Sequence, residues 1–157
     1  MVTQNFASDF TRGAVEVLET YLENPAYVAT GTEESGGDDL EEVAVIIGIT
    51  GRVEGRMILE MGMKTALRLC EALNWGEPFA AFNEMARATL SELANLVSGR
   101  AVTYLNDKGT LVSITPPVIF CGKGMKACSY LTPFVVPIET DCGQLKVNVA
   151  VQENDDD

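Results

Sequence analysis

Residues 83–107 read NEMARATLSELANLVSGRAVTYLND, and this stretch predicts the element on which the rest of the domain packs. Apolar side chains recur in it at spacings of three and four residues, which is the pattern of a helix that buries one stripe. The stripe comprises Ala86, Leu90, Leu93, Ala94, Val97, Ala101 and Tyr104. We therefore predict one long helix over this stretch, packed across the rest of the domain.

The opposite side of the predicted helix carries unusually little bulk. At 100° per residue, four residues fall within about 60° of one another on that side: Ala88, Glu92, Asn95 and Gly99. A carboxylate and a carboxamide one turn apart thus rise between two residues with almost no side chain. We interpret Ala88 and Gly99 as a partner-binding surface, with Glu92 and Asn95 as the candidate functional groups.

Asn95 and Gly99 are both poor helix formers in the middle of a helix. Asn has low helix propensity, and Gly costs about 1 kcal/mol relative to Ala. Close approach of another molecule would explain Gly99, and packing against a neighbouring strand is the alternative. A second Glu-x-x-Asn pair, Glu71 and Asn74, falls at a helix end, where we expect Asn74 to be a structural, left-handed cap.

Composition limits the classes of partner. The chain has 157 residues, of which 46% are hydrophobic and 22% charged, as in an ordinary globular domain. Its net charge of −12 argues against a nucleic-acid partner. No apolar run reaches the roughly 18 residues of a membrane span, and the N-terminus lacks a signal-peptide pattern. We expect no membrane partner and a cytoplasmic protein.

The cysteine and histidine content restricts the chemistry. The four cysteines, at positions 70, 121, 128 and 142, form no C-x-x-C pair, and the chain has no histidine. We therefore expect buried free thiols, no metal site and no bound cofactor. Because no histidine can act as a general base, any catalysis must use carboxylates, amides, hydroxyls or groups supplied by a partner.

The flanking segments predict the rest of an α/β (α+β) two-layer domain over residues 1–152. We expect a mixed, largely antiparallel sheet with the long central helix and two shorter helices packed on it. The first helix is expected to begin at a Ser8 or Asp9 cap, and the second to cover 63–74. Predicted strands cover 43–50, 56–61, 111–115, 125–140 and 144–152, with Gly51 to Gly55 as the first hairpin turn.

Two proline positions and the alternation of apolar and polar residues predict finer features of the sheet. Pro133 and Pro137 stand four apart in one predicted strand, which is therefore expected to be an edge strand or bulged. Apolar residues alternate with polar ones over 144–152, so one side of the sheet is expected to be covered. The acidic, Gly-rich segment 30–42 predicts a mobile loop, and 153–157 a disordered acidic tail.

Three motifs resemble one known family. The run SELANLVSGRA (91–101), with IGITGRVEGRMIL (47–59) upstream and ITPPVIFCG (114–122) downstream, resembles the CheX branch of the CheC, CheX and FliY family of bacterial chemotaxis phosphatases. The similarity covers about 43–151. It implies helices on a β-sheet and, since only one credible motif copy is present, a CheX-like protein that pairs as a homodimer through its sheet.

The resemblance also implies an activity. Members of the family dephosphorylate the response regulator CheY, and Glu92 and Asn95 match the acidic and amide members of their motif. Asn95 would then hold a water in line with the aspartyl phosphate, and Glu92 would pair with the receiver's active-site Lys. Mg²⁺ is expected on the phosphorylated CheY-like partner and not on this chain.

Two other interpretations use the same helix. One is a non-catalytic module that binds a receiver domain or the flagellar switch. The other is a structural homodimer in which Glu92, Asn95 and Gly99 contact the second copy.

Overall fold

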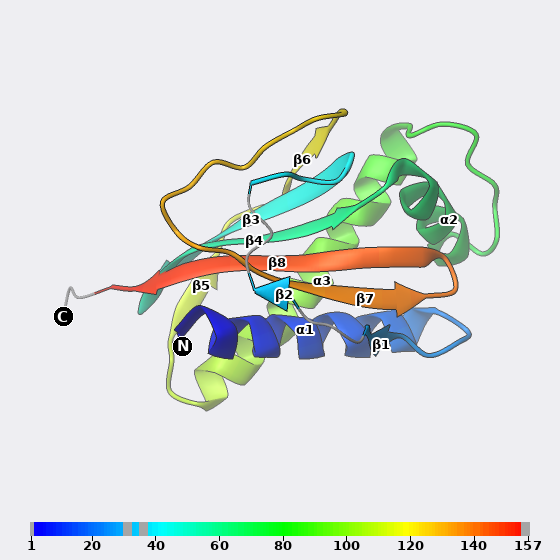
Figure 1. The fold of residues 1–157 in the computed structure, drawn as a ribbon. Coiled ribbons are helices and arrows are strands. Elements are labelled where there is room, and N and C mark those ends of the chain that lie inside the picture. The colour runs from blue at the N-terminus through cyan, green and yellow to red at the C-terminus, as the bar shows by residue number, and fades with distance from the viewer. Residues whose placement is uncertain (1, 30–32, 35–37, 155–157) are drawn as a thin grey trace.

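The computed structural model describes residues 2–29, 33–34 and 38–154, which form one sheet with helices packed on it (Figure 1). Its helices are α1 (Val2–Tyr21), α2 (Met63–Leu73) and α3 (Glu84–Asp107). The α2 and α3 segments agree with the predicted ranges. The expected two-layer α+β architecture is therefore confirmed.

The sheet has eight strands in the described part of the chain. They are β1 (Tyr27–Val28), β2 (Glu33–Glu34), β3 (Val43–Gly51), β4 (Val53–Met61), β5 (Val112–Ile114), β6 (Val118–Cys121), β7 (Phe134–Thr140) and β8 (Gly143–Glu153). The order is β1-β7-β8-β4-β3-β5, with β2 beside β7 and β6 beside β3. All pairings among the described strands are antiparallel.

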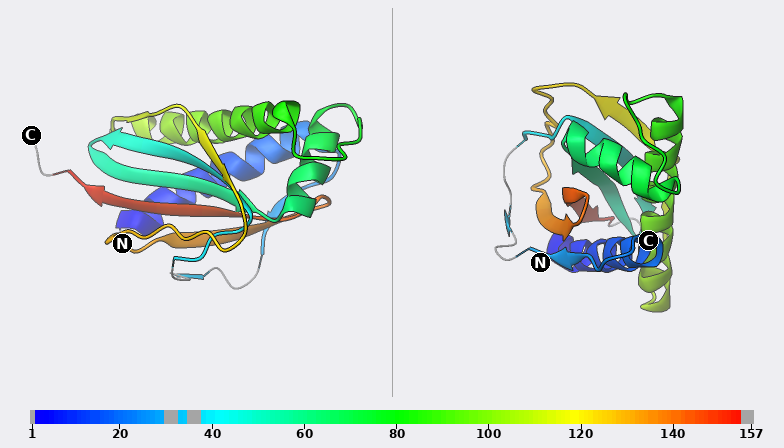
Figure 2. Two further views of the ribbon diagram at one scale, coloured as in Figure 1. Left: turned by 90° about the horizontal axis from the view of Figure 1, so that it is seen from above. Right: turned by 90° about the vertical axis from the view of Figure 1, so that its right-hand side faces the viewer.

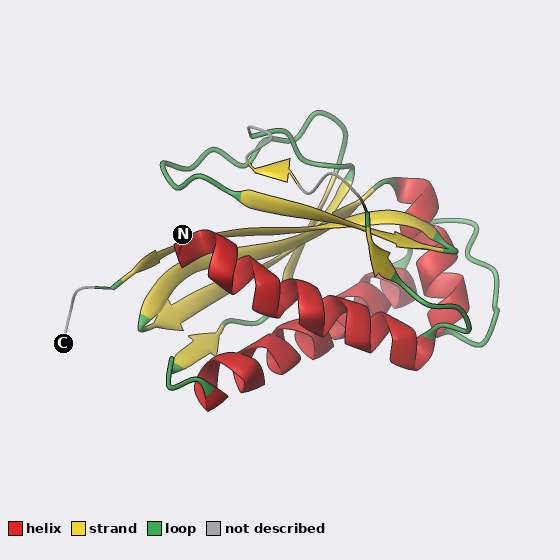
Figure 3. Cartoon of the chain, turned by 60° about the horizontal axis from the view of Figure 1, so that its bottom comes forward, coloured by secondary structure: helices red, strands yellow, loops and turns green. Residues whose placement is uncertain are grey.

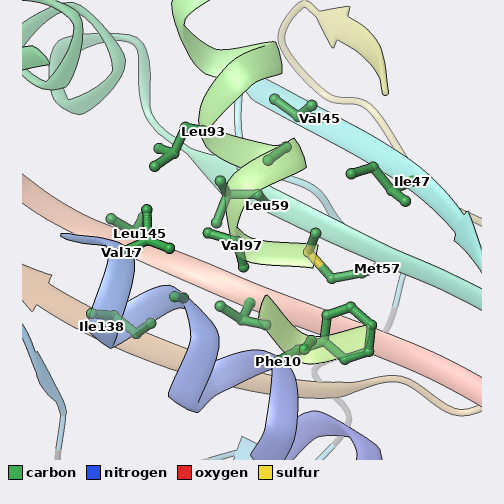
Figure 4. Close-up of a cluster of buried hydrophobic side chains, with 14 of the residues drawn as sticks. Phe10, Val17, Val45, Ile47, Met57, Leu59, Leu93, Val97, Ile138 and Leu145 are labelled. Atoms are coloured by element: carbon green, nitrogen blue, oxygen red, sulfur yellow. The ribbon is translucent and has the colours of Figure 1, made fainter. Parts of the chain in front are cut away.

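The main core lies between the sheet and the helices. α1 and α3 cross in front of the sheet in Figure 3, and α2 packs beside them. Figure 4 shows Phe10 and Val17 of α1, Leu93 and Val97 of α3 and the sheet residue Met57 in one buried cluster. Burial of this apolar stripe stabilises α3 far more than its intrinsic helix propensity does.

The other face of the sheet is also covered in its middle, so the expectation of a single covered side was wrong. Ala44, Ile58 and Ala150 point away from the helices and are fully buried. β2 and the described segments that lead to β3 and follow β6 lie on the side of the sheet away from α3 (Figure 2, left). Leu40 N donates to Met125 O over 3.0 Å, which joins two of the covering segments.

Buried polar groups on this face are satisfied by one another. Asn148 Nδ2 donates to Glu60 Oε2 over 2.8 Å, and the Arg56 guanidinium donates to Asn148 Oδ1 over 3.0 Å. The other oxygen of the Glu60 carboxylate, Oε1, accepts a hydrogen bond from Glu41 N over 3.0 Å. Burial lowers the pKa of Arg56, and the nearby Glu60 charge opposes that shift. The alternating side chains of β8 therefore point to two covered faces of the sheet, one of which is apolar and packs on the helices, while the other includes buried polar groups.

The β3–β4 hairpin is confirmed, but its turn is tighter than expected. Only Arg52 separates the two strands, and Gly55 belongs to β4. Gly55 has φ +153°, and a Cβ atom there would lie 2.0 Å from Ala150 O on β8. Gly55 therefore permits close approach of β8 and does not form the turn.

α1 begins earlier than expected, at Val2, so Ser8 and Asp9 lie inside it and are not caps. The buried Asp9 carboxylate accepts a hydrogen bond from Lys108 Nζ over 2.8 Å. This ion pair joins α1 to the end of α3. Asp9, which was expected to cap α1, thus forms a tertiary contact instead.

The segment between β5 and β8 differs most from the prediction. β6 was not predicted, and it pairs with β3 directly after Pro116-Pro117. β7 begins only at Phe134, so Pro133 lies outside it. Pro137 does lie in β7, between the positions that pair with the two-residue strands β1 and β2, and its carbonyl accepts from Ala29 N. Pro137 has no backbone N–H to donate, and β7 tolerates it because neither β1 nor β2 pairs with that position.

The acidic segment 30–42 is only partly described. Residues 33–34 pair with β7, and Asp39 forms an ion pair with Lys126, so these parts are anchored. Residues 30–32 and 35–37 lie outside the described part of the chain, and the expected mobility of the loop stays a prediction there. β8 includes Glu153, the first residue of the expected tail, and residues 155–157 are likewise not described.

Candidate active site

α3 is fixed at both ends by side-chain and backbone caps. Asn83 Oδ1 accepts from Ala86 N over 2.9 Å at the N-cap, and Lys108 N donates to Tyr104 O and Leu105 O at the C-cap. The predicted stripe is buried except for Tyr104, which is half-buried, and Ser98 and Leu105 are buried with it. The prediction of the long packed helix is confirmed.

The opposite side of α3 faces solvent. Ala88, Glu92, Asn95 and Gly99 are all exposed, and we call these four residues the ridge. Among the described residues, neither Glu92 nor Asn95 has a hydrogen-bond or ion-pair partner for its side chain. Both groups are therefore available to another molecule.

Gly99 has open space above it. A Cβ atom built there meets no atom of the described residues within 4 Å. Packing against a strand of this chain is thus excluded as the reason for this glycine. Its backbone is exposed to an approaching partner, which is the remaining interpretation.

α3 is held rigidly against α1. A Cβ atom at Gly13 of α1 would lie 2.9 Å from Val97 O, so the two backbones meet closely there. Glu16 joins the helices with a 3.0 Å ion pair to Arg100 and a hydrogen bond from the Tyr104 hydroxyl. The Tyr104 hydrogen bond, aided by the guanidinium groups of Arg12 and Arg100, lowers the pKa of Glu16 below its ordinary value. These contacts lie on the flank of α3 that faces α1 and leave the ridge bare.

The end of α2 supports α3 near the ridge. Asn74 Nδ2 donates to Cys70 O over 2.7 Å and to Thr89 Oγ1 over 2.9 Å. The structural role expected for Asn74 is confirmed, but the left-handed conformation is not. Asn74 has φ −119°, and the next residue, Trp75, has φ +61° and is fully exposed.

Sequence reasoning missed a groove beside the ridge. It has a volume of about 350 Å³ and is formed by all three helices. Its principal walls are Tyr21, Leu73, Met85 and Leu96, and Ala88 and Glu92 of the ridge also line it. The sequence alone does not reveal this groove, because its α3 side is closed by Tyr21 at the end of α1 and Leu73 at the end of α2, which only the tertiary fold brings there.

The described residues include no group of three or more His, Cys, Asp or Glu side chains placed to hold a metal ion. That this chain binds no metal stays a prediction. All four cysteines are free, but only Cys70 and Cys142 are buried, so the expectation of four buried thiols was wrong for Cys121 and Cys128. Burial raises the pKa of Cys70 to about 11. No described helix has the length and apolar character needed to cross a bilayer.

Comparison with known proteins gives concordant results. The family profile described as chemotaxis phosphatase CheX matches residues 43–139. The CheY-P phosphatase CheX of Thermotoga maritima is 32% identical over 96 residues, which cover 61% of this chain. The match spans 62% of that relative, just under two thirds of its length.

Solved structures share the fold over most of the chain. A chain of the CheX-CheY-BeF3-Mg²⁺ complex from Borrelia burgdorferi has a TM-score of 0.79 and 32% identity, covering 94% of this chain and 98% of its own. The chemotaxis protein CheX of Desulfovibrio desulfuricans has a TM-score of 0.84 at 18% identity, with 94% and 99% covered. A helix-on-sheet fold, a bare ridge on its longest helix and a profile match over more than half of the sequence agree, and the chain belongs to the CheX family of chemotaxis phosphatases.

Proposed function

We propose that this protein removes the phosphoryl group from the aspartyl phosphate of a CheY-like response regulator, with Asn95 and Glu92 as the catalytic residues. The observation that carries the proposal is the ridge: an amide and a carboxylate, one turn apart, exposed on a rigid helix and bordered by residues of minimal size. A receiver domain can approach such a ridge closely enough for both side chains to enter its phosphorylation site.

The chemistry suits an amide. An aspartyl phosphate is an activated acyl phosphate, so hydrolysis needs a correctly held water more than a strong base. The Asn95 amide both donates and accepts hydrogen bonds at any ordinary pH, and it holds that water in line. The water oxygen attacks phosphorus, the bond to the aspartyl oxygen breaks, and the carboxylate leaves with the electron pair. The water protons leave with inorganic phosphate or pass to solvent.

Glu92 orients the complex. Its carboxylate pairs with the active-site Lys of the receiver, and this ion pair fixes where Asn95 points. Mg²⁺ belongs to the receiver, where it neutralises charge on the phosphoryl group. The lack of histidine is consistent with this scheme, because no step requires an imidazole.

The relatives support this assignment. The matched Thermotoga protein is named a CheY-P phosphatase, and the matched Borrelia structure is a complex of CheX with CheY, BeF3 and Mg²⁺. Both are 32% identical to this chain. Pairing of two copies through the sheet, which the family resemblance implies, stays part of the proposal.

The decisive experiment follows the lifetime of the acyl phosphate. A CheY-type receiver is phosphorylated with a small-molecule phosphodonor, freed of donor, and incubated with and without this protein in Mg²⁺. We expect at least a tenfold faster loss of phosphate, abolished by chelating Mg²⁺. Binding of the receiver with an unchanged or longer lifetime would instead identify the non-catalytic module.

The structural-homodimer interpretation predicts a different result. If the ridge joined two copies, Glu92→Arg would dissociate an oligomer measured by sedimentation. If the wild type is a monomer, or if it is a dimer that Glu92→Arg does not dissociate, the ridge is free to bind a receiver.

We also propose a cytoplasmic location. Its support is the family membership together with two exposed free cysteines, Cys121 and Cys128, because exposed thiols persist in reducing compartments. Fractionation of cells that express a tagged copy tests this directly.

A further inference from the structure

The groove beside the ridge is mostly apolar and already formed in the free protein. Tyr21 comes from the end of α1, Leu73 from the end of α2, and Met85 and Leu96 from α3. Tyr21 and Met85 are 54% and 58% exposed. Large apolar side chains that are this exposed and that converge on one hollow mark an interaction site more often than scattered ones do.

Two of the polar residues that line the groove, Asn74 and Thr89, are hydrogen-bonded within the protein. Both amide hydrogens of Asn74 are donated, to Cys70 O and Thr89 Oγ1, and the Thr89 hydroxyl donates to Met85 O over 2.8 Å. A visiting polar group would therefore find few donors there. The groove favours an apolar occupant and excludes one that needs several hydrogen bonds.

The groove is continuous with the ridge. Ala88 and Glu92 line it, and on helical geometry Met85, Thr89 and Leu96 lie within about 60° of Glu92 around α3. A molecule that pairs with Glu92 therefore extends over the groove. The ridge alone offers four residues, whereas a stable protein interface buries about 800 Å² on each side, so docking must include neighbouring surface.

We infer that this groove is a specificity-determining docking site that receives an apolar side chain of the response regulator while its phosphorylation site meets the ridge. The inference rests on the proposed function for the identity of the partner. A volume of about 350 Å³ holds one bulky side chain and is too small for a helix. Glu92 and Asn95 thus act on a group common to receivers, and the groove selects which receiver docks.

Binding is tested with a receiver activated by BeF3⁻ and Mg²⁺, so that the affinity is measured without hydrolysis of a phosphoryl group. The variant Tyr21→Gln/Met85→Gln makes the two exposed walls polar without lowering helix propensity at either position. Leu111→Gln is the matched control, because Leu111 is 64% exposed and follows the far end of α3. We expect the double variant to raise Kd about tenfold, the control to stay within twofold of wild type, and kcat at saturating receiver to be unchanged in both.

A second measurement reports occupancy directly. With methionine methyl groups labelled in this protein only, the Met85 signal, assigned from Met85→Gln, should shift on addition of receiver. The signal of Met57, which is fully buried in the core, should not. An unmoved Met85 signal at saturation, or a Kd within twofold of wild type in the double variant, overturns the inference.

The two proposals fail separately. If the wild type shortens the phosphate lifetime but the double variant binds normally, only the groove is wrong. If the wild type binds without hydrolysis and the double variant binds weakly, the groove is right and the catalytic proposal is wrong. Absence of any binding by the wild type overturns both.

Discussion

Asn74 Nδ2 donates a hydrogen bond to Thr89 Oγ1 over 2.9 Å, joining the end of α2 to α3 one turn before Glu92. The same nitrogen donates to Cys70 O, so Asn74 also closes the last turn of its own helix. The pair positions the part of α3 from which the ridge rises.

Asn74→Ala should lower the free energy of unfolding by about 2 kcal/mol, because two partly buried hydrogen bonds are lost. Urea denaturation of Asn74→Ala, Thr89→Val and the double variant forms a mutant cycle. We expect the double variant to be more stable than the sum of the two losses predicts. Simple additivity would mean that the Asn74–Thr89 contact contributes nothing.

Asn95→Ala should reduce phosphatase turnover about a hundredfold while the receiver still binds, because only the alignment of water is lost. Phosphate lifetime gives the rate, and titration with BeF3⁻-activated receiver gives Kd. The matched control is Asn5→Ala, an exposed asparagine on α1. Turnover at the wild-type rate in Asn95→Ala would exclude the amide from the reaction.

Glu92→Gln should weaken receiver binding about tenfold and make the binding less sensitive to salt, because a charged hydrogen-bonded pair becomes a neutral one. Binding is measured at two or more ionic strengths. Glu19→Gln, an exposed position on α1 with the same change of charge, separates this local effect from the change in net charge. Equal Kd values and equal salt slopes for the two variants would contradict a role in pairing.

Two glycines should respond oppositely to the same substitution. Gly99→Ala should raise the free energy of unfolding by about 1 kcal/mol, since a methyl group meets nothing and Ala favours the helix. Gly13→Ala should lower it by about 1–2 kcal/mol, because its methyl group would lie 2.9 Å from Val97 O. Thermal and urea unfolding report both, and the same sign for both variants would contradict the helix packing described above.

Gly99→Leu should separate folding from docking. Leu is a good helix former with open space at this position, so stability should not fall. The added bulk on the ridge should nevertheless raise Kd for the activated receiver at least tenfold. Wild-type affinity in a folded Gly99→Leu protein would show that no partner approaches this backbone.

Local periodicity was enough to predict the parts of the fold that carry the ridge. The stripe from Ala86 to Ala101 has only one helical arrangement that buries it, so the opposite face followed directly. The β3–β4 hairpin is likewise a local structure, set by the β-branched run of β3, the apolar residues of β4 and Gly51. The family resemblance added the expected chemistry of Glu92 and Asn95.

The features that the sequence did not reveal depend on distant contacts. β6 is four residues long and exists because it pairs with β3, more than 70 positions earlier in the chain. The left-handed residue after α2 is Trp75, while Asn74 is hydrogen-bonded to Thr89 of α3, a contact that the local sequence does not show. The groove arises where three helices meet, and Tyr21 and Leu73, which close it, come from outside α3.

Asn95 of the ridge stands outside the groove, whose lining includes Glu92 but not Asn95. The groove itself is mostly apolar, and Asn74 and Thr89 in its lining are already hydrogen-bonded within the protein. A free metabolite with an acyl phosphate, such as acetyl phosphate, would not be retained long enough to react. Discrimination between a signalling protein and the pool of small phosphodonors thus follows from the apolar character of the groove, since the receiver must supply the charged groups that hold the phosphoryl group.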